Sequence, residues 1–133
     1  MKKYIGTKVI MAEPQEKDGK EGYKVQYEDG YVSWSPKDVF ERAYRAFDGG
    51  MEFGHAIELL KMGFRLKRRG WNGKDQYIEL AKKISYERPD GELEFCVHGD
   101  IGNKAIAFVG TSGIQMGWLA TQSDMLAEDW IVA

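Results

Sequence analysis

Short segments in which apolar and polar residues alternate, each followed by a turn that contains glycine, dominate this sequence and narrow the range of possible folds. Residues 23–27 alternate in this way, residues 28–30 form a turn signal, and residues 31–34 lead back along the first segment. This pattern is typical of a β-hairpin with one buried face. Residues 64–69 alternate similarly and precede a glycine-flanked turn at 70–73. Such short strands favour antiparallel pairing.

Between these strand segments lie stretches in which apolar residues have the spacing of a helix. Apolar residues recur every three or four positions from Val39 to Phe47, after a Ser35-Pro36 pair in which the serine can cap and the proline suits the first helical position. A second helix is expected from Phe53 to about Met62, and a short capped turn at 121–126. Further strands are expected at 7–12, 76–81, 93–97, 105–109 and 129–132. The sequence therefore predicts an α+β fold: an antiparallel sheet packed with two helices, preceded by a β-hairpin module.

The sequence Asp48-Gly49-Gly50 marks a boundary between two expected domains. We expect residues 1–48 to form a β-hairpin plus helix module and residues 51–133 to form the second domain. A chain of 133 residues has room for one ordinary domain, or a small domain with such an appendage.

Composition excludes several classes of protein. A net charge of −2 excludes a generally basic protein that coats nucleic acid, and 43% hydrophobic residues indicate a globular chain. The single cysteine, Cys96, excludes an intramolecular disulfide and a cysteine-rich zinc site. No apolar run has the length of a membrane helix, and the N-terminus lacks the apolar stretch of a signal peptide. We expect a soluble intracellular protein.

Motifs for catalysis are missing. The sequence contains no GxSxG, P-loop or GxGxxG motif, and His55 and His98 have no partner at metal-ligand spacing. No pair of carboxylates is singled out by its spacing. We therefore expect no catalytic residue, no metal site and no cofactor.

The segment 61–74 carries six cations and no acid. They are Lys61, Arg65, Lys67, Arg68, Arg69 and Lys74. One interpretation is a solvated strand edge, where Lys and Arg discourage pairing with other chains. The other is a wall that binds phosphate, because three of these side chains (Arg65, Lys67 and Arg69) would share one strand face and arginine binds phosphate oxygens in a bidentate fork.

Two tryptophans lie beside polar groups that suit a ligand. Trp71 offers a flat face for stacking a base, and Asn72 offers both a donor and an acceptor, although the same turn could simply fold its tryptophan onto the core. Trp118 precedes Thr121, which looks like a helix N-cap, with Asp124 three residues later. This aspartate could accept hydrogen bonds from ribose or a base, or it could serve as a plain cap. The other two tryptophans of the chain, Trp34 and Trp130, are expected to pack in the core or at an interface.

Three segments taken together, 51–56, 69–74 and 118–130, resemble the second Thoeris anti-defence family of phages. The resemblance covers about residues 51–133, and its most specific part is the run from Trp118 to Trp130. Residues 29–36 resemble an N-terminal module found on various phage proteins, for which no function is known.

The resemblance implies a sponge rather than an enzyme. Family members sequester a cyclic ADP-ribose isomer, an immune messenger, without cleaving it, and some also bind cyclic dinucleotides of the CBASS system at a separate site. They form homotetramers with pockets between subunits and act in the cytoplasm of the infected bacterial host. The ligand-binding residues implied by the matching motifs are Phe53, Trp71, Asn72, Trp118, Thr121, Ser123 and Asp124, with Arg69 as a phosphate contact.

Two rival functions remain open. A phosphodiesterase that degrades such messengers would need a metal or an acid–base pair. A small module that binds single-stranded nucleic acid would use the basic segment beside Trp71, although the net charge of −2 argues against it. We expect no membrane partner and no long nucleic acid.

Overall fold

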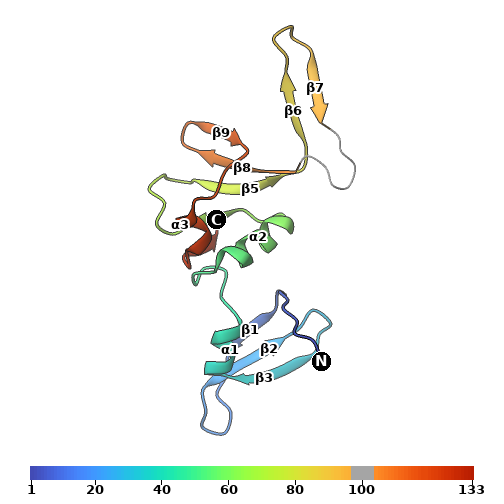
Figure 1. The fold of residues 1–133 in the computed structure, drawn as a ribbon. Helices are drawn as coiled ribbons and strands as arrows, with labels where there is room; N and C mark the ends of the chain where they lie inside the picture. The colour runs from blue at the N-terminus through green and yellow to red at the C-terminus, as the bar shows by residue number, and fades with distance from the viewer. Residues whose placement is uncertain (97–103) are drawn as a thin grey trace. The chain divides into compact units, whose positions relative to one another are not determined.

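The computed structural model describes residues 1–96 and 104–133 and contains two compact units, 1–46 and 47–133 (Figure 1). The N-terminal unit is a three-stranded antiparallel sheet in the order β1-β2-β3, followed by one helix. Its elements are β1 (Met11–Pro14), β2 (Gly22–Gln26), β3 (Val32–Pro36) and α1 (Lys37–Ala43).

The hairpin expected at 23–34 is confirmed, because β2 and β3 pair in antiparallel register with Gln26 opposite Val32. The strand expected at 7–12 instead begins at Met11. One face of the sheet packs on α1, where the rings of Tyr23 and Phe40 stack with centroids 4.1 Å apart. Val25 is buried and forms the centre of this small core.

The first helix is shorter than its apolar spacing predicts. Ser35 does not cap it: the residue belongs to β3, and Pro36 is the N-cap with no side-chain capping bond. The helix ends at Ala43 because Tyr44 is extended, with φ −129° and ψ 150°. Phe47 belongs to the C-terminal unit, where its ring meets that of Phe64 edge-on at 5.5 Å. The apolar period therefore continued into a residue that packs in a different core.

The C-terminal unit contains a five-stranded antiparallel sheet in the order β10-β4-β5-β8-β9 and a separate β6-β7 hairpin (Figure 1). The elements are α2 (Phe53–Lys61), β4 (Leu66–Arg68), β5 (Tyr77–Ala81), β6 (Ile84–Glu87), β7 (Leu93–Cys96), β8 (Ala105–Gly110), β9 (Gly113–Met116), α3 (Gln122–Leu126) and β10 (Trp130–Val132). The expected α+β class is confirmed, with the capped turn at 121–126 forming a third helix. Strands β6 and β9 were not expected.

Helix α2 packs against β4, β5 and β10 and covers one face of the sheet. Register explains which side chains lie there: Leu66 pairs with Ile78, Ile78 pairs with Phe108, and Trp130 pairs with Arg68, so all of them share the face. Among the residues of this unit whose side chains the structure describes, the buried apolar ones are Met51, Ala56, Leu59, Leu60, Leu66, Ile78, Ala107 and Trp130.

Gly63 ends α2 as expected. Its φ of 96° is left-handed, its N–H donates to the Leu60 carbonyl, and the Phe64 N–H donates to the Leu59 carbonyl. These two bonds form a Schellman motif, which turns the chain directly into β4. The helix and the strand that carries Arg68 are thereby held in a fixed relation.

Candidate functional site

Five rings, one each from Phe53, Trp71, Phe108, Trp118 and Trp130, form an aromatic cluster in the C-terminal unit. Trp130 is 0% exposed. Its ring centroid lies 5.4 Å from that of Phe53, 5.5 Å from that of Trp71 and 6.2 Å from that of Trp118. Trp71 also meets Trp118 edge-on at 6.2 Å and Phe108 at 5.5 Å. Trp71 and Trp118 are half-buried, so each of these residues keeps an accessible part beside the buried Trp130.

Backbone and indole hydrogen bonds hold this cluster in place. The indole N–H of Trp130 donates to the Asp124 carbonyl oxygen at 2.9 Å. Met51 and Trp130 exchange two backbone bonds of 2.7 and 3.1 Å, which brings the start of α2 to the last strand. The N–H of Trp118 donates to the Ile106 carbonyl at 2.9 Å. The N–H of Trp71 donates to the Arg68 carbonyl at 3.2 Å, so both half-buried tryptophans are bonded to residues of the sheet.

Beside the cluster, Arg68 bridges two aspartates, and we call these three residues the Arg68 network. Its Nε donates to Asp129 at 2.9 Å and its Nη1 to Asp124 at 3.0 Å. The other Asp129 oxygen accepts the Gly70 N–H at 3.4 Å, which ties the turn before Trp71 to the network. The network therefore joins β4, α3, β10 and the turn that carries Trp71.

Ionisation of this network follows from its hydrogen bonds. Burial alone would raise the pKa of Asp124, but the bonds from Thr121 and Arg68 lower that pKa below its ordinary value. Burial would likewise raise the pKa of Asp129, whereas Arg68 and the Gly70 N–H lower it. The pKa of Arg68 is raised, chiefly by its hydrogen bond to Asp129. All three groups are charged at neutral pH.

The helix cap expected at Thr121 is confirmed as a capping box. The Thr121 hydroxyl accepts the Asp124 N–H at 3.1 Å, and one Asp124 oxygen accepts the Thr121 N–H and its hydroxyl, both at 2.9 Å. Asp124 is only 8% exposed, and its second oxygen accepts from Arg68. This carboxylate thus positions α3 and β4, while Thr121 and Ser123 are exposed at the start of the helix.

Three of the six cations in the basic segment form ion pairs with carboxylates of the described residues. Arg65 pairs with Glu79 at 3.2 Å and lies over the Tyr77 ring at 4.6 Å. Lys61 pairs with Glu58, and Arg68 with its two aspartates. Arg69 is exposed and donates to the Asp48 carbonyl oxygen, and Asn72 is exposed in the loop that follows. The expected wall of Arg65, Lys67 and Arg69 therefore contains one arginine that already has a carboxylate partner.

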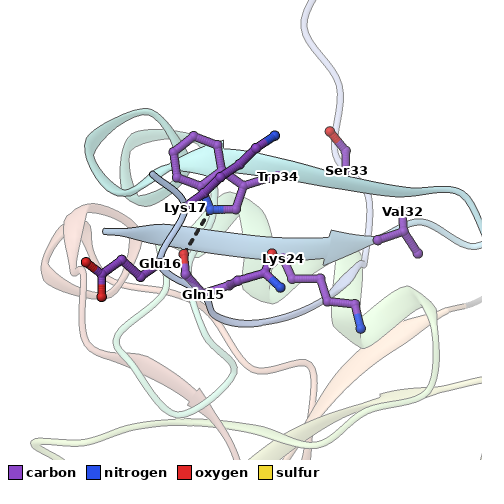
Figure 2. Close-up of a pocket in the computed structure, with 7 residues that line it drawn as sticks. All are labelled: Gln15, Glu16, Lys17, Lys24, Val32, Ser33 and Trp34. Carbon is purple, nitrogen blue, oxygen red and sulfur yellow. Dashed lines mark hydrogen bonds between the residues drawn. The ribbon is translucent and has the colours of Figure 1, made fainter. Parts of the chain in front are cut away.

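The N-terminal unit has a hollow of about 650 Å³ beside Trp34, and Figure 2 shows the residues that line it. The indole N–H of Trp34 donates to the Gln15 carbonyl at 2.8 Å, and Lys17 Nζ lies 5.7 Å from the ring centroid. The ring also lies against Gly22, where a Cβ would collide with indole atoms. Trp34 is therefore half-buried and packs against its own sheet, as the packing interpretation expects.

The expected ligand residues come together in part. Phe53, Trp71 and Trp118 share the aromatic cluster, and Asp124 joins it through the carbonyl that binds Trp130. Sequence reasoning missed Phe108, and it assigned Trp130 to packing without recognising that this residue braces the other rings. Alternation in 105–109 was a usable signal for Phe108, because it places the ring on the face of Ile78.

Of the two histidines, the structure describes His55, which takes part in a helix cap. His55 Nδ1 accepts the Glu52 N–H at 3.4 Å in the capping box of α2. His98 and the Cys96 side chain lie outside what the structure describes. Among residues 1–96 and 104–133, no three His, Cys, Asp or Glu side chains gather as metal ligands. Over the same residues, no helix is long and apolar enough to span a membrane.

Two comparisons with known proteins agree. Residues 51–133 match the Thoeris anti-defense 2-like domain. The chain is also 36% identical over 83 residues to the Thoeris anti-defense 2 protein of Bacillus phage SP01, which covers 60% of this chain and 91% of that relative. Every ring of the aromatic cluster and all three residues of the Arg68 network lie within residues 51–133. The chain belongs to the Thoeris anti-defense 2-like family of phage anti-defence proteins.

Proposed function

We propose that this protein binds a cyclic ADP-ribose isomer, an immune messenger of the infected host, and sequesters it without cleaving it. The observation that carries the proposal is the accessible part of Trp71 and Trp118, braced on the fully buried Trp130. A base stacked on such a ring gains about 1–3 kcal/mol. Phe53 belongs to the same cluster. Asn72 follows Trp71 in its loop and would contact ribose, and Arg69 precedes that loop and would contact phosphate.

The ordered surroundings of the proposed site support the proposal that the protein sequesters the messenger. A protein that competes with an effector for a messenger must release it slowly, and a preorganised site reduces the entropy lost on binding. The Arg68 network fixes the turn before Trp71, and the Thr121 capping box fixes α3, so the groups around the ligand are ordered before it arrives. In this proposal Asp124 acts by positioning Thr121 and Ser123, since its own oxygens are bonded within the protein.

We further propose a homotetramer with messenger pockets between subunits. Large apolar side chains are strongly exposed in the C-terminal unit near Trp118 and on the edge strand β9; they include Ile114, Leu119 and Leu126. A contiguous apolar patch marks an interaction surface, so the proposal requires that these side chains meet in the subunit contacts. Cyclic dinucleotides are included in the proposal as additional ligands, and the place of action is the host cytoplasm.

The decisive experiment separates holding the messenger from destroying it. Purified protein is incubated with a cyclic ADP-ribose isomer, filtered to measure free messenger, then heat-denatured, and the released nucleotide is identified by mass spectrometry. We expect the free messenger to disappear and to return intact after heating. A linear product, with turnover blocked by a chelator, would instead establish the phosphodiesterase.

Variants of Trp71 test whether the messenger binds at the aromatic cluster. Trp71→Ala should leave most messenger free, while Trp71→Phe should retain part of the binding because a ring remains. Tyr86→Ala removes an exposed aromatic side chain from β6 and serves as the matched control. Binding of oligonucleotides that weakens steeply with salt would favour the single-stranded nucleic-acid module instead.

A further inference from the structure

Gln76 lies at the end of the aromatic cluster, just before β5. Side chains alternate along a strand, so Gln76 shares the face of Ile78, which is also the face of Phe108. Tyr77 pairs with Val109, so the register continues to place Gln76 opposite Gly110. The residue is half-buried.

Two glycines make the space for the Gln76 amide. A Cβ on Gly73 would coincide with the amide atoms of Gln76. A Cβ on Gly110 would lie 3.7 Å from Gln76 Nε2 and only 2.8 Å from the Phe108 ring. The amide therefore occupies a slot between two backbone segments, next to Phe108, whose ring centroid is 5.5 Å from that of Trp71.

The amide has hydrogen-bonding capacity that the protein leaves unused. A glutamine amide offers one acceptor oxygen and two donor hydrogens. Among the side-chain hydrogen bonds of residues 1–96 and 104–133, none involves the Gln76 amide. The amide is therefore free to bond with water or with a ligand at this end of the aromatic cluster.

We propose that Gln76 reads the edge of a purine base stacked on Trp71, and that it selects adenine. A glutamine amide matches adenine in a bidentate way, accepting from the 6-amino group and donating to N7. The inference rests on the proposed function, since it assigns the base specificity of the same site. Gly73 and Gly110 hold the amide in register with the base edge.

Calorimetric titration with two ligands tests this assignment: the cyclic ADP-ribose isomer and its counterpart with hypoxanthine in place of adenine. Hypoxanthine presents an oxygen where adenine presents an amino group, so the pairing with the amide oxygen is lost. Wild type should prefer the adenine ligand by about 5- to 100-fold, the discrimination typical of one bidentate amide–base pair. Gln76→Met fills the same slot without donors or acceptors, and it should reduce this preference to less than about threefold.

A matched variant and a folding check complete the design. Gln26→Ala removes an exposed glutamine from β2 in the other unit and should leave both affinities unchanged. Thermal melts should show that Gln76→Met folds like wild type. If Gln76→Met keeps the adenine preference, the assignment of Gln76 is overturned while the sponge stands. If wild type binds neither ligand, the proposed function fails and this inference fails with it.

Discussion

Replacing Arg68 with methionine should destabilise the C-terminal unit far more than the same replacement of Arg65, although both arginines come from the same stretch of chain and pair with acids. Arg68 is 23% exposed and contacts two carboxylates, one of which belongs to the 8% exposed Asp124. Removing one partner of a buried pair costs about 3–5 kcal/mol because it leaves the other charge unpaired. Partial exposure of the network lowers our expected cost to about 2–4 kcal/mol.

Arg65 provides the matched control. Its pair with Glu79 has a similar length, 3.2 Å, but the two side chains are 56% and 37% exposed. Exposed pairs of this kind contribute about 0–1 kcal/mol. Methionine keeps an apolar stem of similar length at both positions, so the comparison isolates the charge and its hydrogen bonds.

The assay is thermal unfolding followed by tryptophan fluorescence. Three of the four tryptophans lie in the C-terminal unit and report its unfolding. In a domain of this size, 1 kcal/mol shifts Tm by about 4–8 °C. Arg68→Met should therefore lower Tm by about 8–32 °C, and Arg65→Met by at most about 8 °C. Equal shifts for the two variants would refute the view that the Arg68 network holds the site together.

Three further predictions follow from the same structure. The pKa values of Asp124 and Asp129 are lowered in the folded state, so the stability they provide is present above about pH 4 and lost as pH falls through those lowered values. Asp124→Asn should therefore make the urea midpoint depend less on pH between pH 6 and pH 2. A pH dependence equal to that of wild type would contradict this. Gly50→Ala should lower the free energy of unfolding in urea by about 1–3 kcal/mol, because the φ of Gly50 is 94° and a Cβ would lie 2.8 Å from a backbone carbonyl oxygen. In Gly54→Ala the added Cβ on α2 has no atom within 4 Å, so this variant should gain up to about 1 kcal/mol. Trp130→Ala should cost about 3–5 kcal/mol and abolish the near-ultraviolet circular dichroism of the cluster; a retained signal would mean that Trp130 is not its centre.

Local signals in the sequence were sufficient for the elements that depend on near neighbours. The hairpin at 23–34, the Gly63 end of α2 and the Thr121 capping box are all determined within a few residues, and all three are confirmed. The end of α1 was predicted wrongly, because Phe47 satisfies the helical period but packs on Phe64 in the other unit.

The contacts of the candidate site could not be predicted from the sequence, because they join residues that are far apart in the chain. Arg68 appeared in the sequence as one of six similar cations, and only the pairing of β4 with β10 brings it to Asp129. Trp130 was expected to pack, and it does, but its role as support for Trp71 and Trp118 depends on three segments that are far apart in the chain. The resemblance implies that Asp124 contacts the ligand, and this stays a prediction; in the structure its oxygens accept hydrogen bonds from Arg68 and Thr121.

The most direct measurement is calorimetric titration of a cyclic ADP-ribose isomer into wild type, Trp71→Ala and Trp34→Ala. Trp71 lies in the aromatic cluster, whereas Trp34 lies beside the hollow of the N-terminal unit. We expect tight binding by wild type, at least a tenfold loss of affinity for Trp71→Ala, and affinity within about twofold of wild type for Trp34→Ala, since stacking contributes about 1–3 kcal/mol. Undiminished binding by Trp71→Ala, or loss of binding by Trp34→Ala alone, would contradict the placement of the messenger on the aromatic cluster.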